Sequence, residues 1–197
     1  MPDAVQTINL DNIRFVKYDP LLQPLIKVSD FDCGDPDLNG FLKDDLEHHR
    51  EQMMTQSVLI VHDTKIIGYY TLQADAIQLA PDEKKSFILR GMKYKTFPAV
   101  KIGRLAVQKA LQNQGIGKLA MRYIIGTIRR SYWDVAARFI TVDAKKEGNS
   151  LEFYTKFGFV PNKKENEAER ETISLRYDLY NPPKESGEQQ TSLNQTT

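Results

Sequence analysis

The sequence feature that most constrains the fold is the stretch of residues 101–130, KIGRLAVQKALQNQGIGKLAMRYIIGTIRR. Residues 102–107 are an apolar run that predicts a buried strand, and residues 108–114 are a polar connection. Apolar residues then recur at spacings of three and four, which predicts a long amphipathic helix. Its apolar face is predicted to consist of Ile116, Leu119, Ala120, Tyr123, Ile124 and Ile128.

Two glycines, Gly115 and Gly117, stand at the head of this predicted helix. Glycine lets a ligand approach the backbone closely, and the first turn of a helix has N–H groups without internal partners. Together with the positive end of the helix dipole, these donors favour an anion such as a pyrophosphate. The chain is therefore predicted to bind a phosphorylated cofactor here.

Three phosphate-binding motifs compete for this stretch. A P-loop is excluded, because Gln112 and Leu119 stand where that motif requires Gly and Ser or Thr. The run Gly115-x-Gly117-x-x-Ala120 satisfies a loose dinucleotide fingerprint, and Asp143 lies downstream at the end of another apolar run. However, seven residues separate the predicted strand from the glycines, and too little chain follows Asp143 for a doubly wound sheet.

The third motif, Gln112-x-x-Gly115-x-Gly117, resembles the coenzyme A pyrophosphate loop of the GNAT N-acetyltransferases. Residues 139–143 predict a second strand, and residues 149–159, NSLEFYTKFGF, are similar to the end of a GNAT domain. In that ending an Asn precedes a short helix that carries a Tyr, and the chain returns through Gly-Phe. The resemblance covers roughly residues 31–179.

The resemblance implies one α/β domain, residues 1–180, with a mixed and strongly bent central sheet and helices on both faces. Its central strands, 102–107 and 139–143, are expected to splay apart around the pantetheine. Near the end, Ile173, Leu175 and Tyr177 alternate with polar residues, which predicts a strand buried on one face. Residues 181–197 are rich in Pro, Ser, Gln and Thr without an apolar pattern, which predicts a disordered tail.

The resemblance also implies a cofactor, acetyl-CoA, and a role for each site residue. Backbone groups of Leu105 and Val107 would pair with the pantetheine, and Asn149 would contact it. Tyr154 would donate a proton to the leaving thiolate. Asn113 replaces a glycine that is frequent in the family, which we expect to be tolerated if its φ is negative. The full predicted cofactor site is Leu105, Ala106, Val107, Gln112, Asn113, Gln114, Gly115, Ile116, Gly117, Lys118 and Asn149.

A narrower resemblance is carried by residues 31–35 (FDCGD), 68–72 (GYYTL) and 103–107 (GRLAV). These segments are similar to the GNAT branch of bacterial toxins that act on charged transfer RNA. The resemblance implies acetylation of the α-amine of aminoacyl-tRNA, inhibition of translation, a ribbon-helix-helix antitoxin and a homodimer. An N-acetyltransferase for a small-molecule or protein amine, and a non-catalytic coenzyme A-binding module, remain as alternatives.

Two observations concern the acyl acceptor. Residues 80–100 combine basic side chains with aromatics, so Arg90, Lys93 and Lys95, together with Arg104, are predicted to contact RNA. A solvated loop whose aromatics point inward is the alternative. The strand 102–107, which carries an acidic base in many GNAT enzymes, has no carboxylate here. This absence favours an acceptor that deprotonates easily, such as an α-amine, unless Asp75 or a water chain supplies the base.

Composition excludes several other classes. Lys plus Arg number 27 and Asp plus Glu number 26, so no net charge indicates a nucleic-acid or membrane protein. The single cysteine, Cys33, cannot form an internal disulfide, and the N-terminus has no signal pattern. No apolar run is long enough to span a bilayer, and no metal site is predicted. We therefore expect a cytoplasmic protein.

Overall fold

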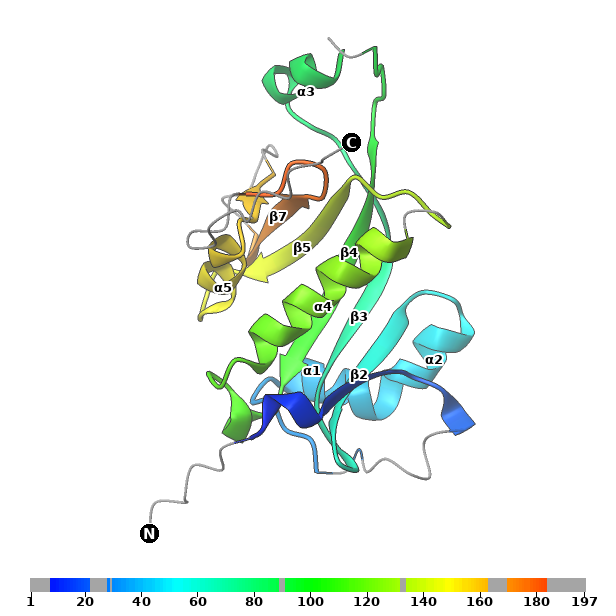
Figure 1. Cartoon of the computed structure of the whole chain (residues 1–197), viewed down its shortest axis with the longest axis vertical. Coiled ribbons are helices and arrows are strands. Elements are labelled where there is room, and N and C mark those ends of the chain that lie inside the picture. The colour runs from blue at the N-terminus through cyan, green and yellow to red at the C-terminus, as the bar shows by residue number, and fades with distance from the viewer. Residues whose placement is uncertain are drawn as a thin grey trace, which may run out of the picture.

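A computed structural model describes residues 8–21, 28, 30–88, 91–131, 134–162 and 170–183. The elements form a single α/β domain with seven strands and helices on both faces of the sheet (Figure 1). The predicted fold class is thereby confirmed. Of the predicted tail, residues 181–183 are described and the rest lies outside the described residues. No helix in the described ranges is long and apolar enough to cross a membrane.

The seven strands form one mixed sheet in the order β1-β2-β3-β4-β5-β7-β6. Every neighbouring pair is antiparallel except β4 and β5, which are parallel. The strands are β1 (Ile13–Lys17), β2 (Gln56–His62), β3 (Lys65–Ile77), β4 (Phe97–Val107), β5 (Phe139–Lys145), β6 (Val160–Pro161) and β7 (Thr172–Asp178).

The two central strands separate partway along their length, as predicted. β4 and β5 are paired from Ala99 opposite Phe139 to Ile102 opposite Val142. Beyond that point β4 continues to Val107 beside β3, whereas β5 continues to Lys145 beside β7. The register of β3 against β4 shifts at the same level, because Leu72 pairs with Ile102 and Thr71 with Arg104. A gap therefore opens in the sheet just after Ile102 and Val142.

Helix α4 (Ile116–Arg130) lies across one face of the sheet, in front of β3 and β4 in Figure 1. Its buried side chains are Ile116, Ala120, Met121, Ile124 and Ile128. Two residues of the predicted apolar face, Leu119 and Tyr123, are therefore not among the buried side chains. Tyr123 is partly exposed and stacks on Phe15 with ring centroids 4.0 Å apart. Met121, which the spacing pattern omitted, is fully buried instead.

The opposite face of the sheet is covered by a helical segment made of α1 (Pro36–Gly40), a π-helical turn (Phe41–Asp45) and α2 (Leu46–Glu51). Asp35 caps α1, since its carboxylate accepts hydrogen bonds from the N–H groups of Asp37 and Leu38. Phe41, Leu42 and Leu46 are buried and pack toward Tyr69 of β3. This packing fixes the start of α1 near the gap between β4 and β5.

The remaining helices are α3 (Pro81–Ile88), which lies at the end of β3 and β4 far from the head of α4, and α5 (Ser150–Lys156) beside β5 (Figure 1). A short 3₁₀ helix (Lys109–Leu111) follows β4, and another (Leu10–Asn12) precedes β1. The prediction that β7 is buried on one face only was wrong. Arg176 is 9% exposed, because it forms an ion pair with Glu83 of α3 and donates to Asn162 Oδ1.

Candidate functional site

A cavity of about 600 Å³ occupies the gap between β4 and β5. It is bordered by the end of β4, the loop before α4, the head of α4, β5, the start of α5 and the cap of α1. Its lining residues are Asp35, Leu38, Ile102, Gly103, Arg104, Leu105, Val107, Leu111, Gln112, Asn113, Gly115, Gly117, Lys118, Val142, Asp143, Lys145, Asn149, Ser150, Phe153 and Tyr154.

Most of the predicted cofactor site lies around this cavity. Ala106 and Ile116 do not line it, since their side chains are buried in the cores on either face of the sheet, and Gln114 does not line it either. The predicted residues that line it are Leu105, Val107, Gln112, Asn113, Gly115, Gly117, Lys118 and Asn149.

The head of α4 has the form of an anion site. Gly115 is the N-cap residue with φ of 88°, a left-handed conformation that glycine adopts without steric cost. The N–H of Leu119 donates to the Gly115 carbonyl at 2.9 Å, so the N–H groups of Ile116, Gly117 and Lys118 precede the first helical hydrogen bond. In the described chain no side chain caps these donors. The geometry fits a pyrophosphate, with Lys118 beside it.

Two details of this loop differ from expectation. The φ of Asn113 is 64°, so the expectation of a negative φ was wrong. Asn is among the few residues that adopt the left-handed conformation readily, which explains why it can replace glycine here. At Gly117 an added Cβ would lie 3.3 Å from the Phe153 ring, so this glycine also permits close packing of α4 against α5.

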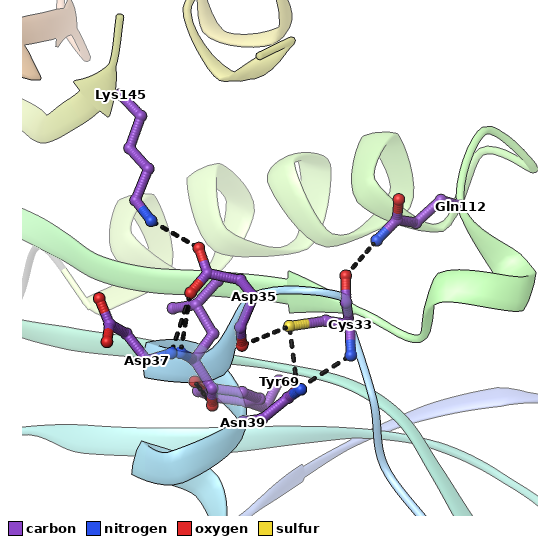
Figure 2. A network of polar contacts seen from close by, with 8 residues as sticks. Cys33, Asp35, Asp37, Asn39, Tyr69, Gln112 and Lys145 are labelled. Atoms are coloured by element: carbon purple, nitrogen blue, oxygen red, sulfur yellow. Dashed lines mark hydrogen bonds and ion pairs between the residues drawn. The ribbon is translucent and has the colours of Figure 1, made fainter. Parts of the chain in front are cut away.

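Gln112 joins the loop to its surroundings (Figure 2). Its Nε2 donates to the carbonyl of Cys33 at 2.9 Å and to the carbonyl of Val107 at 3.0 Å. Cys33 itself is buried, and its N–H donates to Asn39 Oδ1. Gln112 therefore fixes the end of β4 to the segment that leads into α1, across one end of the cavity.

Tyr154 lies in the second turn of α5 and lines the cavity. Its ring is 7% exposed and packs between Phe153 and Phe159, with centroids 5.2 and 5.4 Å away. Burial raises the pKa of the Tyr154 phenol above its ordinary value of about 10. The phenol is therefore protonated at neutral pH and is a hydrogen-bond donor inside the cavity.

The cavity wall formed by the α1 cap and the ends of β4 and β5 carries charged side chains. Only one of these charged residues was predicted from the sequence as a site residue. Arg104, predicted as a substrate contact, lies over the Phe41 ring with its guanidinium carbon 3.7 Å from the centroid. Asp35, Asp143 and Lys145 were not predicted there. Lys145 Nζ lies 2.5 Å from Asp35 Oδ2 and so joins β5 to α1 (Figure 2), and this hydrogen bond lowers the pKa of Asp35.

The other predicted substrate contacts lie elsewhere. Lys93 and Lys95 are exposed in the connection between α3 and β4, and neither lines the cavity. Arg90 lies outside the described residues. Two of the three aromatics in this region, Phe87 and Phe97, are buried, whereas Tyr94 is 64% exposed. The alternative of inward-facing aromatics thus holds for two of the three rings.

Asp75, the sequence-based candidate for a base, does not line the cavity; its carboxylate accepts a hydrogen bond from the Thr141 hydroxyl. Within the described ranges there is no group of three or more His, Cys, Asp or Glu side chains that could hold a metal ion.

The gap between two parallel strands, the anion site at the head of α4 and the buried phenol define a coenzyme A-dependent acyltransferase domain. The profile of the GNAT acetyltransferase domain matches residues 32–175, and the chain belongs to this family. It is an acetyl-CoA-dependent N-acetyltransferase, so the alternative of a non-catalytic module is set aside.

The chain is similar to one curated toxin sequence and to solved structures of toxins. The chain is 25% identical to the tRNA-acetylating toxin of Mycobacterium tuberculosis over 132 residues, which are 67% of this chain and 77% of the toxin. AtaT complexed with acetyl-methionyl-tRNAfMet is 23% identical with a TM-score of 0.71, covering 85% of this chain and 95% of AtaT. A Tyr-to-Phe AtaT mutant bound to the C-terminus of the antitoxin AtaR and acetyl-CoA is 24% identical, with a TM-score of 0.68 and coverage of 86% and 95%. These two structures support the fold.

Replacing Gly115 with Ala is expected to weaken acetyl-CoA binding. A Cβ at φ of 88° costs about 1–2 kcal/mol, and relief of this strain turns the loop donors away from the anion. At about 100 times the wild-type Kd, acetyl-CoA stabilises the folded protein by about 2.7 kcal/mol, and a tenfold weaker affinity removes about 1.4 kcal/mol of that. Thermal unfolding with and without acetyl-CoA measures the difference.

Gly91→Ala is the matched control for this substitution. Gly91 has φ of 79° and no atom within 4 Å of an added Cβ, and it lies in the connection between α3 and β4. We expect it to lose similar intrinsic stability but to keep the full stabilisation by acetyl-CoA. Equal stabilisation of the Gly115→Ala variant and the wild type by acetyl-CoA would contradict the placement of the pyrophosphate.

Proposed function

We propose that this chain transfers the acetyl group of acetyl-CoA to the α-amine of aminoacyl-tRNA and thereby inhibits translation. The observation that carries the proposal is the similarity to a tRNA-acetylating toxin, which extends over 132 residues. The family domain that matches residues 32–175 includes both strands of the gap and the head of α4.

The charges around the cavity support an anionic acceptor. Arg104 lines the wall opposite α4, and its stacking on Phe41 holds the guanidinium in place without using its hydrogen-bond donors. Arg is suited to phosphate because its planar donors can bind two oxygens at once. We infer that Arg104 contacts the phosphate backbone near the 3′ end of the tRNA while the aminoacyl group enters the cavity.

Lys93 and Lys95 can serve the same substrate at a greater distance. Both are exposed and flank Tyr94 in the connection between α3 and β4. Figure 1 shows α3 at the end of β4 that lies far from the head of α4. A strand rises about 3.3 Å per residue, so the six steps from Phe97 to Gly103 span about 20 Å. A tRNA whose reactive end lies in the cavity is long enough to reach this second basic segment, where its backbone would meet the two ammonium groups.

The proposal extends to the partners of a toxin. We infer that a ribbon-helix-helix antitoxin is made with the chain, that the protein acts in the cytoplasm where charged tRNA is available, and that it forms a homodimer. An N-acetyltransferase for a small-molecule or protein amine remains the competing assignment within the same family.

Purified protein incubated with labelled acetyl-CoA is expected to label charged tRNA and to leave uncharged tRNA unlabelled, because only the charged form offers an α-amine. In a cell-free translation extract the wild type should stop protein synthesis when acetyl-CoA is present. Hydrolysis of the labelled tRNA should release an N-acetylated amino acid. Absence of label from charged tRNA, with acetyl transfer to other amines intact, would assign the chain to the competing class.

A further inference from the structure

We propose that Asp143 is the general base of acetyl transfer, supplied by β5 in place of the carboxylate that β4 does not carry. This inference rests on the family's N-acetyltransferase reaction and not on the identity of the acceptor. Asp143 lines the cavity on β5, directly after Val142, the last residue that pairs with β4. The base is therefore placed at the gap itself, where the two strands separate.

The orientation of Asp143 follows from its neighbours. Val142 packs in the same core cluster as Tyr154 and α4, so the next side chain along the strand points to the opposite face of the sheet. The ion pair between Asp143 Oδ2 and Lys101 Nζ, 2.6 Å long, places both side chains on that face. Asp143 and Tyr154 thus reach the cavity from opposite faces of the sheet, where a base for the amine and an acid for the sulfur are needed.

Among the described residues that line the cavity there is one other carboxylate, Asp35, and its contacts make it a poorer base. Its Oδ1 accepts hydrogen bonds from the Asp37 and Leu38 N–H groups, and its Oδ2 pairs with Lys145. Three donors hold its charge, and the pair with Lys145 ties two walls of the cavity together. Asp35 therefore has a structural role, whereas Asp143 lies on the wall next to the gap with its side chain 40% exposed.

The charges around Asp143 come from several elements. Lys101 and Arg104 of β4 and Lys145 of β5 are cations on the same face of the sheet as Asp143, Asp35 caps α1, and β7 offers the uncharged Ser174 opposite Asp143. The cations favour a carboxylate in its ionised form, which is the form that accepts a proton. Lys101 positions this carboxylate without being part of the reaction.

Acetyl transfer leaves one surplus proton on the amine nitrogen, and a base must accept it. The neutral amine forms a bond from its nitrogen to the acetyl carbon, and the bond from that carbon to sulfur breaks. Sulfur leaves with a proton from the Tyr154 hydroxyl, and the surplus proton on nitrogen passes to the Asp143 carboxylate. Nitrogen becomes more acidic as the new bond forms, so a carboxylate can accept this proton. Asp143 then releases it to solvent, which balances the proton that Tyr154 recovers.

The test compares Asp143→Asn and Asp143→Ala with the wild type, using the amine that the wild type acetylates fastest. Both variants are expected to lose about 10²–10⁴-fold in single-turnover rate, the usual contribution of a general base. Stabilisation by acetyl-CoA against thermal unfolding should remain at the wild-type level. Added formate should restore part of the rate of Asp143→Ala, because the small acid can enter the vacated space, and should leave Asp143→Asn unchanged.

Asp75→Asn is the matched control. Asp75 is a carboxylate on the neighbouring part of the sheet that does not line the cavity. This variant should keep a rate within a few-fold of the wild type. The inference is overturned by a wild-type rate in Asp143→Asn, by loss of acetyl-CoA binding in it, by an effect on acceptor KM alone, or by absence of formate rescue. Failure of charged tRNA as an acceptor would instead appear in the wild type and overturn only the proposed substrate.

Discussion

Replacing Tyr154 with Phe is expected to lower the single-turnover rate of acetyl transfer by about 10²–10⁴-fold while the fold and acetyl-CoA affinity are kept. The substitution removes one hydroxyl from a ring that is otherwise held by Phe153 and Phe159. The phenol lies at the cavity wall, so a thiolate that leaves there can take its proton from a donor that is already in place. Since burial raises the pKa of this phenol, the proton is present throughout the neutral range.

Tyr70→Phe is the matched control for this prediction. Tyr70 belongs to the same core cluster, is fully buried and has a pKa raised by burial, but it does not line the cavity. Its substitution removes the same hydroxyl group and should leave the transfer rate within about twofold, with a change in stability of about 1 kcal/mol. Rapid-quench measurement of one turnover separates chemistry from product release. Equal rates for Tyr154→Phe and the wild type would remove the phenol from the mechanism.

The cofactor side of the cavity could be predicted from the sequence because one short stretch contains it. Gly115 and the amphipathic helix after it specify a strand, a loop and a helix head in direct succession, and local rules decide each of them. The short helix with Tyr154 follows Asn149 in the same local manner. Such segments depend little on the rest of the chain.

The acceptor side could not be predicted in this way because its charges meet only in three dimensions. Asp35 and Lys145 are 110 residues apart and come from a helix cap and a strand end. Asp143 belongs to the wall of the cavity only because β5 separates from β4 after Val142, and no local pattern indicates where two strands part. The sequence therefore placed Asp143 at the end of a predicted strand without showing that its carboxylate lines the cavity.

Burial was mispredicted where polar contacts replaced the apolar pattern. Alternation along β7 predicted that Arg176 faces solvent, yet the side chain is covered by Glu83 of α3 and by Asn162. A buried charge is tolerated when it is paired and hydrogen-bonded, and these partners lie 93 and 14 residues away. Tyr123 shows the converse, since Phe15 of β1 stacks on its ring at the surface.

The enzyme is expected to prefer α-amines over lysine ε-amines, because a larger fraction of an α-amine is neutral at pH 7. Asp143 can accept a proton only once the nitrogen attacks, so the enzyme depends on the fraction of acceptor that is already neutral. At pH 7 a lysine side chain, with pKa about 10.4, is neutral in about one molecule in 10³, whereas an α-amine with pKa about 7.7–8.0 is neutral in about a tenth. An ester at the adjacent carboxyl lowers the α-amine pKa further, because it withdraws electrons and removes the carboxylate charge.

We therefore expect charged tRNA to be acetylated at least about 10²-fold faster than lysine peptides at pH 7, when both are compared as kcat/KM with labelled acetyl-CoA. The preference should shrink as pH rises, because the neutral fraction of the α-amine levels off above its pKa of about 8, while the neutral fraction of lysine still increases about tenfold per pH unit. A peptide with a free α-amine and no lysine is the control. Like the lysine peptides it has no ester next to the amine, and it differs from them in offering an α-amine in place of an ε-amine. Faster labelling of lysine peptides at pH 7 would show that the active site deprotonates ammonium groups before attack, and would contradict both the substrate assignment and the timing given to Asp143.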